Sequence, residues 1–275
     1  MVDRAPGREV TTEGACSGGP GSCPAEPDAQ VEDGGAGALE PEPAEAAAIF
    51  GDRIELARSY VRSLGTDGVV RGLIGPRETE RLWTRHLLNC AALVELVPVG
   101  SRVVDVGSGA GLPGVVLAIA RPDCDVALLE PLERRVRFLI EVVDRLRLVN
   151  CRVVRGRAQD APDDVRDADV VVSRAVAPLS RLAAWSASLA RPGGMILALK
   201  GSTAEEELRR DRAEVAAAGL REAVVLRLDG PAGTAFVVRA ERGPDRPTRR
   251  RRPARDRSAA AGSGRAGRRN RSGRP

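Results

Sequence analysis

A glycine-rich stretch directly after an apolar run is the part of the chain best suited to binding a small ligand. Residues 102–106 read RVVDV, and the sequence continues as GSGAGLPG through residue 114. Glycines let a strand turn sharply into a helix, and they leave the backbone N–H groups at the helix start open to an anionic group. The residues that we expect to contact this ligand are Asp105, Gly107, Gly109 and Gly111.

Two ligands are compatible with this loop. Residues 109–114 match G-x-G-x-x-G, which is typical of dinucleotide sites and suggests an NAD-dependent oxidoreductase as the alternative function. Asp105, two residues before the loop, instead gives D-x-G-x-G-x-G. That pattern favours S-adenosylmethionine, because its amino-acid end needs glycine N–H groups but carries no pyrophosphate. The chain also offers no convincing base for hydride transfer, so we favour the methyl donor over both NAD and an empty turn.

Further polar residues follow the other short apolar runs. Glu130 comes directly after residues 125–129, where a carboxylate can accept both hydroxyls of a ribose. The other residues in such positions are Ala158 and Gln159 after 151–155, Arg174 after 169–173 and Lys200 after 195–199. The carboxyl ends of parallel strands meet at one edge of a sheet, and ligands collect there. Each residue alone has a plainer interpretation, such as a helix-start charge for Glu130 or a solvated loop position.

The runs alternate with amphipathic stretches, which indicates a parallel sheet covered by helices on both faces. The expected strands are 102–106, 125–129, 151–155, 169–173, 195–199, 222–228 and 234–239. The expected helices are 52–64, 76–96, 113–121, 132–147, 179–190 and 203–218. The turn at residues 229–233 makes the last two strands an antiparallel hairpin. The predicted fold is the α/β, Rossmann-like class I S-adenosylmethionine-dependent methyltransferase fold, a seven-stranded, mostly parallel sheet with an N-terminal helical cap.

The charges divide the chain into three parts. Residues 1–48 carry a net charge of −8, and residues 242–275 carry a net charge of +11 from thirteen arginines and two aspartates. Both segments have too few large apolar residues to offset the entropy of ordering, so we expect two disordered tails. Residues 49–241, with a net charge of +2, form the expected methyltransferase domain, whose cap covers 49–100.

Several classes of protein are excluded by what the sequence lacks. It has no run of about 18 apolar residues that could span a membrane, and no apolar segment typical of a secretory signal follows the first Met. The five cysteines form no C-x-x-C pair, and His86 is the only histidine, so we expect no metal site. These features favour free thiols and a cytoplasmic location.

The order of the motifs over residues 69–208 resembles the small-subunit ribosomal RNA methyltransferase G family, also called glucose-inhibited division protein B. The matching stretches are 72–78 (GLIGPRE), 82–86 (LWTRH), 105–114 (DVGSGAGLPG), 134–139 (RRVRFL), 154–158 (VRGRA), 173–175 (SRA) and 199–201 (LKG). The resemblance implies methyl transfer from S-adenosylmethionine to N7 of a guanine in the 530 loop of 16S ribosomal RNA. It places the donor at Gly107, Leu112, Ala158, Gln159 and Arg174. Gln159 departs from the family, which commonly has Glu there, but Gln keeps an acceptor oxygen.

Guanine N7 has a lone pair and no proton, so this reaction needs no catalytic base, and we name no catalytic residue. The expected partner is 16S ribosomal RNA or the small ribosomal subunit, with no membrane and with the protein a monomer. The candidate RNA contacts are Arg85, His86, Arg134, Arg135 and Lys200. A third interpretation is a non-enzymatic nucleic-acid binder that relies on the arginine-rich tail, which could also tether RNA without sequence preference.

Overall fold

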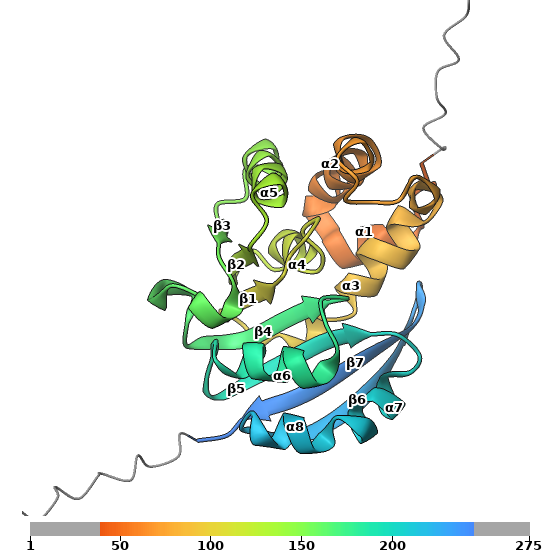
Figure 1. The fold of residues 1–275 in the computed structure, drawn as a ribbon. Helices are drawn as coiled ribbons and strands as arrows, with labels where there is room; N and C mark the ends of the chain where they lie inside the picture. The colour runs from red at the N-terminus through yellow and green to blue at the C-terminus, as the bar shows by residue number, and fades with distance from the viewer. Residues whose placement is uncertain (1–38, 245–275) are drawn as a thin grey trace, which may run out of the picture. The chain divides into compact units, whose positions relative to one another are not determined.

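The computed structural model describes residues 39–244, so most of both predicted tails, 1–38 and 245–275, lies outside the described residues. The described residues form one seven-stranded sheet in the order β3-β2-β1-β4-β5-β7-β6 (Figure 1). The strands are β1 Arg102–Val106, β2 Asp125–Glu130, β3 Cys151–Arg155, β4 Ala168–Arg174, β5 Ala190–Lys200, β6 Leu220–Gly230 and β7 Gly233–Arg242. The α-helices are α1 Glu45–Phe50, α2 Ile54–Ser63, α3 Asn89–Ala91, α4 Gly114–Ala120, α5 Glu133–Leu146, α6 Leu179–Ala187, α7 Ala204–Arg210 and α8 Arg212–Ala217.

The sheet topology confirms the predicted fold class. Strands β1 to β5 pair in parallel, whereas β7 pairs antiparallel with both β5 and β6. The hairpin turn lies between Gly230 and Gly233, within the turn that the sequence indicates. This is the seven-stranded arrangement of class I methyltransferases, in which the order of strands reverses between β1 and β4. In open sheets of this kind the ligand site lies at the carboxyl edge beside that reversal.

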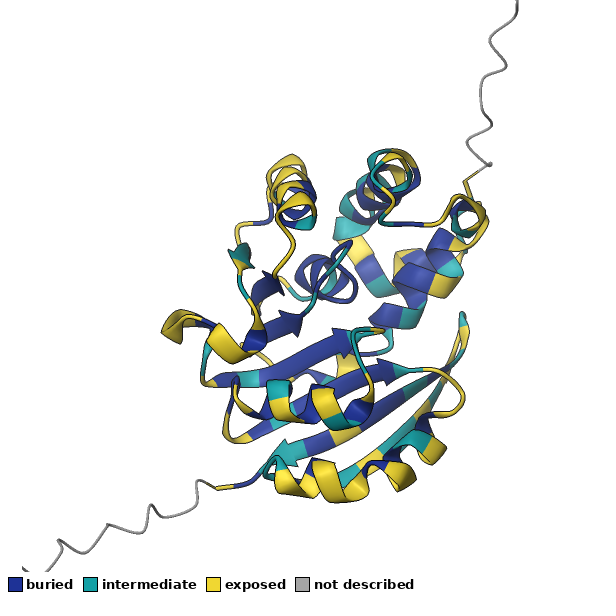
Figure 2. Cartoon of the chain, viewed as in Figure 1, coloured by how far each residue is buried: buried dark blue, intermediate teal, exposed yellow. Residues whose placement is uncertain are grey.

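Helices cover both faces of the sheet, as near-continuous apolar strands require (Figure 2). The central strands are buried along almost their whole length; in β2, for example, every residue after Asp125 is buried. One buried cluster joins the sheet to α1, α2, α4 and α5, and a second joins it to α6, α7 and α8. Both consist mainly of Val, Leu, Ile and Ala, because the chain has only 2% aromatic residues. In the described residues, no helix is both long and apolar enough to cross a bilayer.

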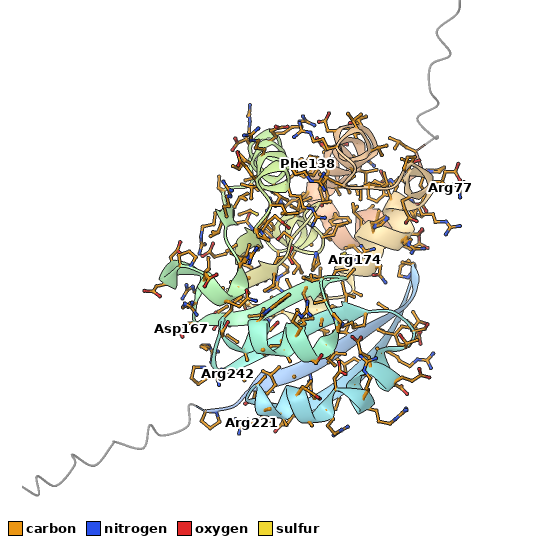
Figure 3. All side chains as sticks on the ribbon, in the orientation of Figure 1. Arg77, Phe138, Asp167, Arg174, Arg221 and Arg242 are labelled. Atoms are coloured by element: carbon orange, nitrogen blue, oxygen red, sulfur yellow. The ribbon has the colours of Figure 1, made fainter. Side chains whose placement is uncertain are left out.

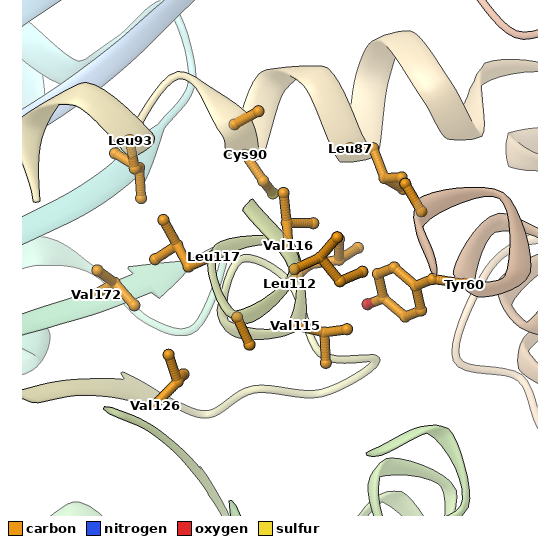
Figure 4. Packing of buried hydrophobic residues seen from close by; sticks show 14 of the residues in the cluster. Tyr60, Leu87, Cys90, Leu93, Leu112, Val115, Val116, Leu117, Val126 and Val172 are labelled. Atoms are coloured by element: carbon orange, nitrogen blue, oxygen red, sulfur yellow. The ribbon is translucent and has the colours of Figure 1, made fainter. Parts of the chain in front are cut away.

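The N-terminal cap packs on α4 and reaches the glycine loop. Figure 4 shows Tyr60 of α2 beside Leu112 and Val115, with Leu87 from the cap close to them. Tyr60 is fully buried, and its hydroxyl donates a hydrogen bond of 2.8 Å to the carbonyl oxygen of Ala110. The cap therefore stabilises the conformation of the loop after β1 as well as covering the core.

The predicted disordered segment 1–48 is wrong over its last ten residues, because α1 begins at Glu45 within it. Ala46 is buried, and Glu42 forms ion-paired hydrogen bonds with Arg58 of α2 at 2.5 and 2.8 Å. A carboxylate oxygen of Glu40 accepts hydrogen bonds from the backbone N–H groups of Trp83 and Thr84. Charges that suggested a solvated tail find their partners 16 residues away for Glu42 and 43 to 44 residues away for Glu40, which composition does not reveal. The predicted start of the other tail is one residue early, since β7 extends to Arg242.

Two predicted helices are broken. The expected helix 76–96 is a 3-10 helix Pro76–Arg81, a π-helix Leu82–Leu88, the short α3 and a 3-10 helix Val94–Leu96. The expected helix 203–218 divides into α7 and α8 at Asp211, a buried residue whose carboxylate accepts a hydrogen bond from the N–H of Ser180. Neither segment contains Gly or Pro after Pro76, so the local sequence gives no signal for either break.

Candidate functional site

A cavity of about 590 Å³ lies at the carboxyl ends of β1, β2 and β4, and a smaller one of about 260 Å³ adjoins it. Gly107, Pro131 and Val176 line both cavities, which therefore form one continuous site. The larger cavity is lined by the glycine loop, Glu130, Arg135, Arg174 and the cap residues Leu73, Ile74 and His86. The cavities thus lie at the carboxyl edge of the sheet, which the sequence predicted as the ligand site.

Gly107 lets the chain turn out of β1 toward this site. Its φ is +68°, and a Cβ there would lie 2.8 Å from Cγ1 of Val176 across the cavity. Gly109 and Leu112 also line the larger cavity, as expected from the sequence. A side chain at position 107 would fill the space in which the two cavities meet, so this glycine keeps them connected.

Asp105 and Gly111 do not line either cavity, although the sequence placed both among the ligand contacts. The Oδ2 atom of Asp105 accepts hydrogen bonds from the hydroxyl of Ser108 at 2.8 Å and the N–H of Gly114 at 3.0 Å. A Cβ at Gly111 would lie 2.6 Å from Cγ2 of Val115 and 2.8 Å from the hydroxyl of Tyr60. Both residues therefore shape the loop from behind it.

Complete burial raises the pKa of Asp105 to about 7, and the charge of Glu130 contributes in the same direction. The hydrogen bonds from Ser108 and Gly114 oppose this shift, but they reach only Oδ2, while Oδ1 has no partner within the described part of the chain. A carboxyl that is fully buried and lines neither cavity is suited to holding the loop.

Glu130 at the end of β2 is buried, with its carboxylate held by two backbone donors. Its Oε2 accepts a hydrogen bond of 2.9 Å from the N–H of Gly109, and its Oε1 accepts one of 3.0 Å from the N–H of Leu132. Each carboxylate oxygen has a second lone pair, so Glu130 can still accept two hydroxyl groups. This fixed pair of acceptors fits the two hydroxyls of a ribose.

The smaller cavity is mostly apolar and fits a flat aromatic base. Ala158 and Gln159, both expected from the sequence, line it together with Val106, Leu129, Val176 and Trp185. The side-chain amide of Gln159 can donate to or accept from a base edge. A ribose-binding carboxylate beside an apolar slot for a base fits the adenosyl part of S-adenosylmethionine, so the residues present are compatible with that cofactor.

Arg174, at the end of β4, joins the sheet to the cap (Figure 3). Its Nη1 lies 3.4 Å from the carbonyl oxygen of His86 and 3.3 Å from Sγ of Cys90. Its Nη2 donates to the carbonyl oxygen of Arg85 at 3.2 Å and lies 2.9 Å from Nδ1 of His86. The guanidinium is therefore fixed against the backbone and side chains of the cap, while it lines the larger cavity.

His86 is held between Arg174 and Glu78. Since an arginine can only donate, Nδ1 of His86 accepts from Arg174, and Nε2 donates to Oε2 of Glu78 at 3.0 Å. Burial, and then the Arg174 cation, lower the pKa of His86 to about 4. The imidazole is therefore neutral near pH 7 and has both nitrogens engaged.

A family model described as rRNA small subunit methyltransferase G matches residues 53–232 of the chain. The chain belongs to this family. The match includes the cap from residue 53 onward, the glycine loop and the strands that surround the two cavities, and it ends in the β6–β7 turn. Its function is therefore methyl transfer to small-subunit ribosomal RNA with S-adenosylmethionine as cofactor, and the NAD-dependent alternative is not favoured.

Relatives of that name are similar over most of the chain. The protein from Salinispora tropica is 57% identical over 173 residues, which cover 61% of this chain and 72% of that protein. The protein from Mycolicibacterium gilvum is 49% identical over 221 residues, covering 78% of this chain and 97% of that protein. The chain is also similar to the structure of Aeropyrum pernix fibrillarin with bound S-adenosylmethionine, at 23% identity and a TM-score of 0.44 over 57% of this chain and 75% of that one.

The predicted RNA contacts of this methyltransferase G chain lie in different places. Arg135 lines the larger cavity, with Nη1 3.8 Å from Oε2 of Glu130, and His86 is buried under Arg174. Lys200 donates to the carbonyl oxygen of Ala177 and to Oε1 of Glu207, both at 3.0 Å. Arg134 is exposed on α5 and lines neither cavity. Of the predicted RNA contacts, only Arg85 is both exposed and beside Arg174.

Further residues of the cap, not predicted from the sequence, belong to this edge of the sheet. Arg81 and Asn89 lie with Arg85 and Arg174 around a further hollow of about 540 Å³. The three cap residues are spaced four apart within a predicted helix, so the spacing already placed them on one face. Pro131, Val176 and Trp185, which line the smaller cavity, had no signal of this kind.

Proposed function

We propose that this protein methylates N7 of a guanine in the 530 loop of 16S ribosomal RNA. The observation that carries the proposal is the state of His86, which has both ring nitrogens engaged and a pKa lowered to about 4. It is a poor proton acceptor at the junction of cofactor cavity and cap. Guanine N7 carries a free lone pair and no proton, so a site without an available base is suited to it.

The donor is held, in this proposal, across the two cavities. The adenine occupies the slot beside Ala158, Gln159 and Trp185, and Glu130 accepts the ribose hydroxyls. The amino-acid end lies at the glycine loop, where Arg135 lines the cavity and its Nε has no hydrogen-bond partner in residues 39–244. A carboxylate next to Arg135 would satisfy that donor. Arg135 thus takes a role on the donor side in place of the predicted contact with RNA.

S-adenosylmethionine, when bound, supplies an electrophilic methyl group. The chain holds the reactants in position. The glycine loop and Glu130 hold the methyl donor, and Arg174, held by its contacts with the cap, forms the wall between the cavity and the cap. Orientation of two reactants can lower a barrier by ~7–11 kcal/mol in favourable cases, and a nucleophile that carries no proton needs no proton transfer in addition. Removal of water from the buried side of the cavity favours the same step.

We further infer that the protein acts in the cytoplasm as a monomer and without a membrane. Cys90, Cys124 and Cys151 are free buried thiols, which is usual in a reducing compartment. The oligomeric state is tested by analytical ultracentrifugation of the full chain, for which a mass near 29.0 kDa is expected. A mass near twice that value would overturn the monomer.

The function is tested with small ribosomal subunits from cells that lack this modification. The full chain and a methyl-labelled donor are added, and the labelled nucleotide is mapped by the chain cleavage that N7-methylguanine permits. We expect one labelled guanine in the 530 loop. Label on another base or on protein would contradict the proposal, and a thermal shift with NAD in place of S-adenosylmethionine would contradict the cofactor.

A further inference from the structure

A third hollow, distinct from the two cofactor cavities, lies between the cap and the ends of β4, β5 and β7. Its volume is about 540 Å³, which is large enough for a nucleotide. Arg81, Thr84, Arg85 and Asn89 line it from the cap side. Because it opens at the carboxyl ends of the strands, it is on the edge of the sheet where the donor site also lies.

This hollow meets the cofactor cavity at the end of β4. Arg174 and Ala175 line both, so a group held in one is separated from the other only by these residues. Ala175 has a φ of +52°, a conformation that is uncommon for a residue with a Cβ. Backbone strain of this kind is retained mainly where the turn has a functional purpose.

The hollow is basic. Its lining contains Arg81, Arg85, Arg174 and Lys200 and no acidic residue. Arg174 and Lys200 are occupied by the contacts described above. Nε of Arg85 forms an ion pair with Glu78 at 3.1 Å, and its two terminal nitrogens have no side-chain partner among residues 39–244. The exposed Arg81 has no side-chain partner in the same range. Two guanidinium groups at the rim are therefore available for an anionic ligand.

Asn89 provides a different kind of contact. It is half-buried in the wall of the hollow, and within the described part of the chain its amide has no side-chain hydrogen bond. A free amide offers both a donor and an acceptor, which complements the polar edge of a base. The hollow thus combines available cations at its rim with an available amide inside it.

We propose that this hollow binds the RNA nucleotide that accepts the methyl group, with Arg81 and Arg85 on the flanking phosphates and Asn89 against the edge of the base. The inference rests on the proposed function, which it extends by naming the acceptor site. The arginines belong on phosphates, because methylation of N7 makes the base positive and a neighbouring cation would oppose that charge. Arginine contacts to phosphate position the strand, and contacts to the base edge select it.

The phosphate contact is tested with Arg81→Ala in the full chain. The matched control is Arg212→Ala, an exposed arginine at the start of α8 that lies outside the lining of the hollow and whose side chain has no partner among residues 39–244. We expect Arg81→Ala to weaken binding of 16S ribosomal RNA roughly five- to tenfold and to reduce the slope of log affinity against log salt by about one. Binding of S-adenosylmethionine, measured by calorimetry, should stay unchanged. Equal RNA affinity and salt slope for the two variants would overturn the phosphate contact.

The base contact is tested with Asn89→Ala. We expect kcat/KM for unmethylated small subunits to fall by about tenfold, with an unchanged affinity for S-adenosylmethionine and an unchanged melting temperature. An unchanged kcat/KM would overturn the role of Asn89. These results are separable from the proposed function: if the wild type labels no guanine, the function fails, whereas the effect of Arg81→Ala on RNA binding still decides the hollow. If the wild type labels the guanine and neither variant has an effect, only the hollow fails.

Discussion

Nη2 of Arg174 lies 2.9 Å from Nδ1 of His86, and this contact connects the end of a central strand to the cap. Arg174 lines both the donor cavity and the basic hollow, so the contact fixes the wall between them. Because His86 is neutral, it can accept from the guanidinium and donate to Glu78 at the same time. Protonation of His86 would remove the acceptor and place two cations side by side.

The first prediction concerns pH. The pKa of His86 is lowered from 6.5 to about 4 in the folded protein, so the unfolded chain takes up this proton at a higher pH than the folded one. The stability that the neutral ring contributes is complete above about pH 6.5 and is lost as the pH falls toward 4. His86→Gln keeps a donor and an acceptor but does not titrate. We expect urea denaturation to show a smaller loss of stability between pH 6.5 and 4 in this variant than in the wild type. Parallel curves for the two proteins would contradict the assignment.

The second prediction concerns the packing behind the glycine loop. A Cβ at Gly114 would lie 2.3 Å from Cδ2 of Leu128 and 2.7 Å from Oδ2 of Asp105. Gly114→Ala should therefore lower the free energy of unfolding by about 1–3 kcal/mol, despite the better helix propensity of alanine. Gly75→Ala is the control, since its Cβ would have only an ordinary contact of 3.7 Å with Glu78. Denaturant titration of both variants measures the difference. Equal stability would contradict the prediction, because the loop would then accommodate the added Cβ without a loss of stability.

The third prediction concerns the donor. Glu130→Gln removes the negative charge of the carboxylate that accepts hydrogen bonds from the N–H groups of Gly109 and Leu132 and, as proposed, from the ribose hydroxyls. Hydrogen bonds to a charged group contribute about 1.5–3 kcal/mol, so affinity for S-adenosylmethionine should fall about 10- to 100-fold. Glu133→Gln, at an exposed glutamate on α5, should leave that affinity unchanged. Calorimetric titration measures both, and a tightly binding Glu130→Gln protein would contradict the placement of the ribose.

The fourth prediction concerns Lys200, for which the sequence suggested contact with RNA. Its side chain is 10% exposed and paired with Glu207, which is itself 17% exposed. Lys200→Met would leave Glu207 and the carbonyl oxygen of Ala177 without this donor, so we expect a loss of about 1–3 kcal/mol of stability. The salt dependence of RNA binding should not change. If Lys200→Met instead reduced the slope of log RNA affinity against log salt by about one, Lys200 would be a phosphate contact.

The sequence was most informative where a local pattern decides the structure. Apolar runs ending in Glu130 and Arg174 predicted strands and the edge of the sheet at which the site lies, and both residues line the donor cavity. It was misleading for Asp105, because the sequence pattern of a carboxylate beside a glycine loop is the same whether the side chain faces a ligand or the protein interior. Only the direction of its side chain, toward Ser108 and Gly114, separates the two.

The sequence by itself determined the fold class, the family and the strand ends that carry the site, because alternating strands and helices and the glycine loop are encoded by neighbouring residues. The tertiary structure decided which side chains are available. Lys200 and His86 are bound by partners from other elements, while the side chains of Arg81 and Asn89, in the basic hollow, have no partner among the described residues. The ordered start of the chain at Glu40 and Glu42 was also decided there, through contacts with Trp83 and Arg58. Such partners are distant in the sequence, so their pairing depends on the packed fold and not on local spacing.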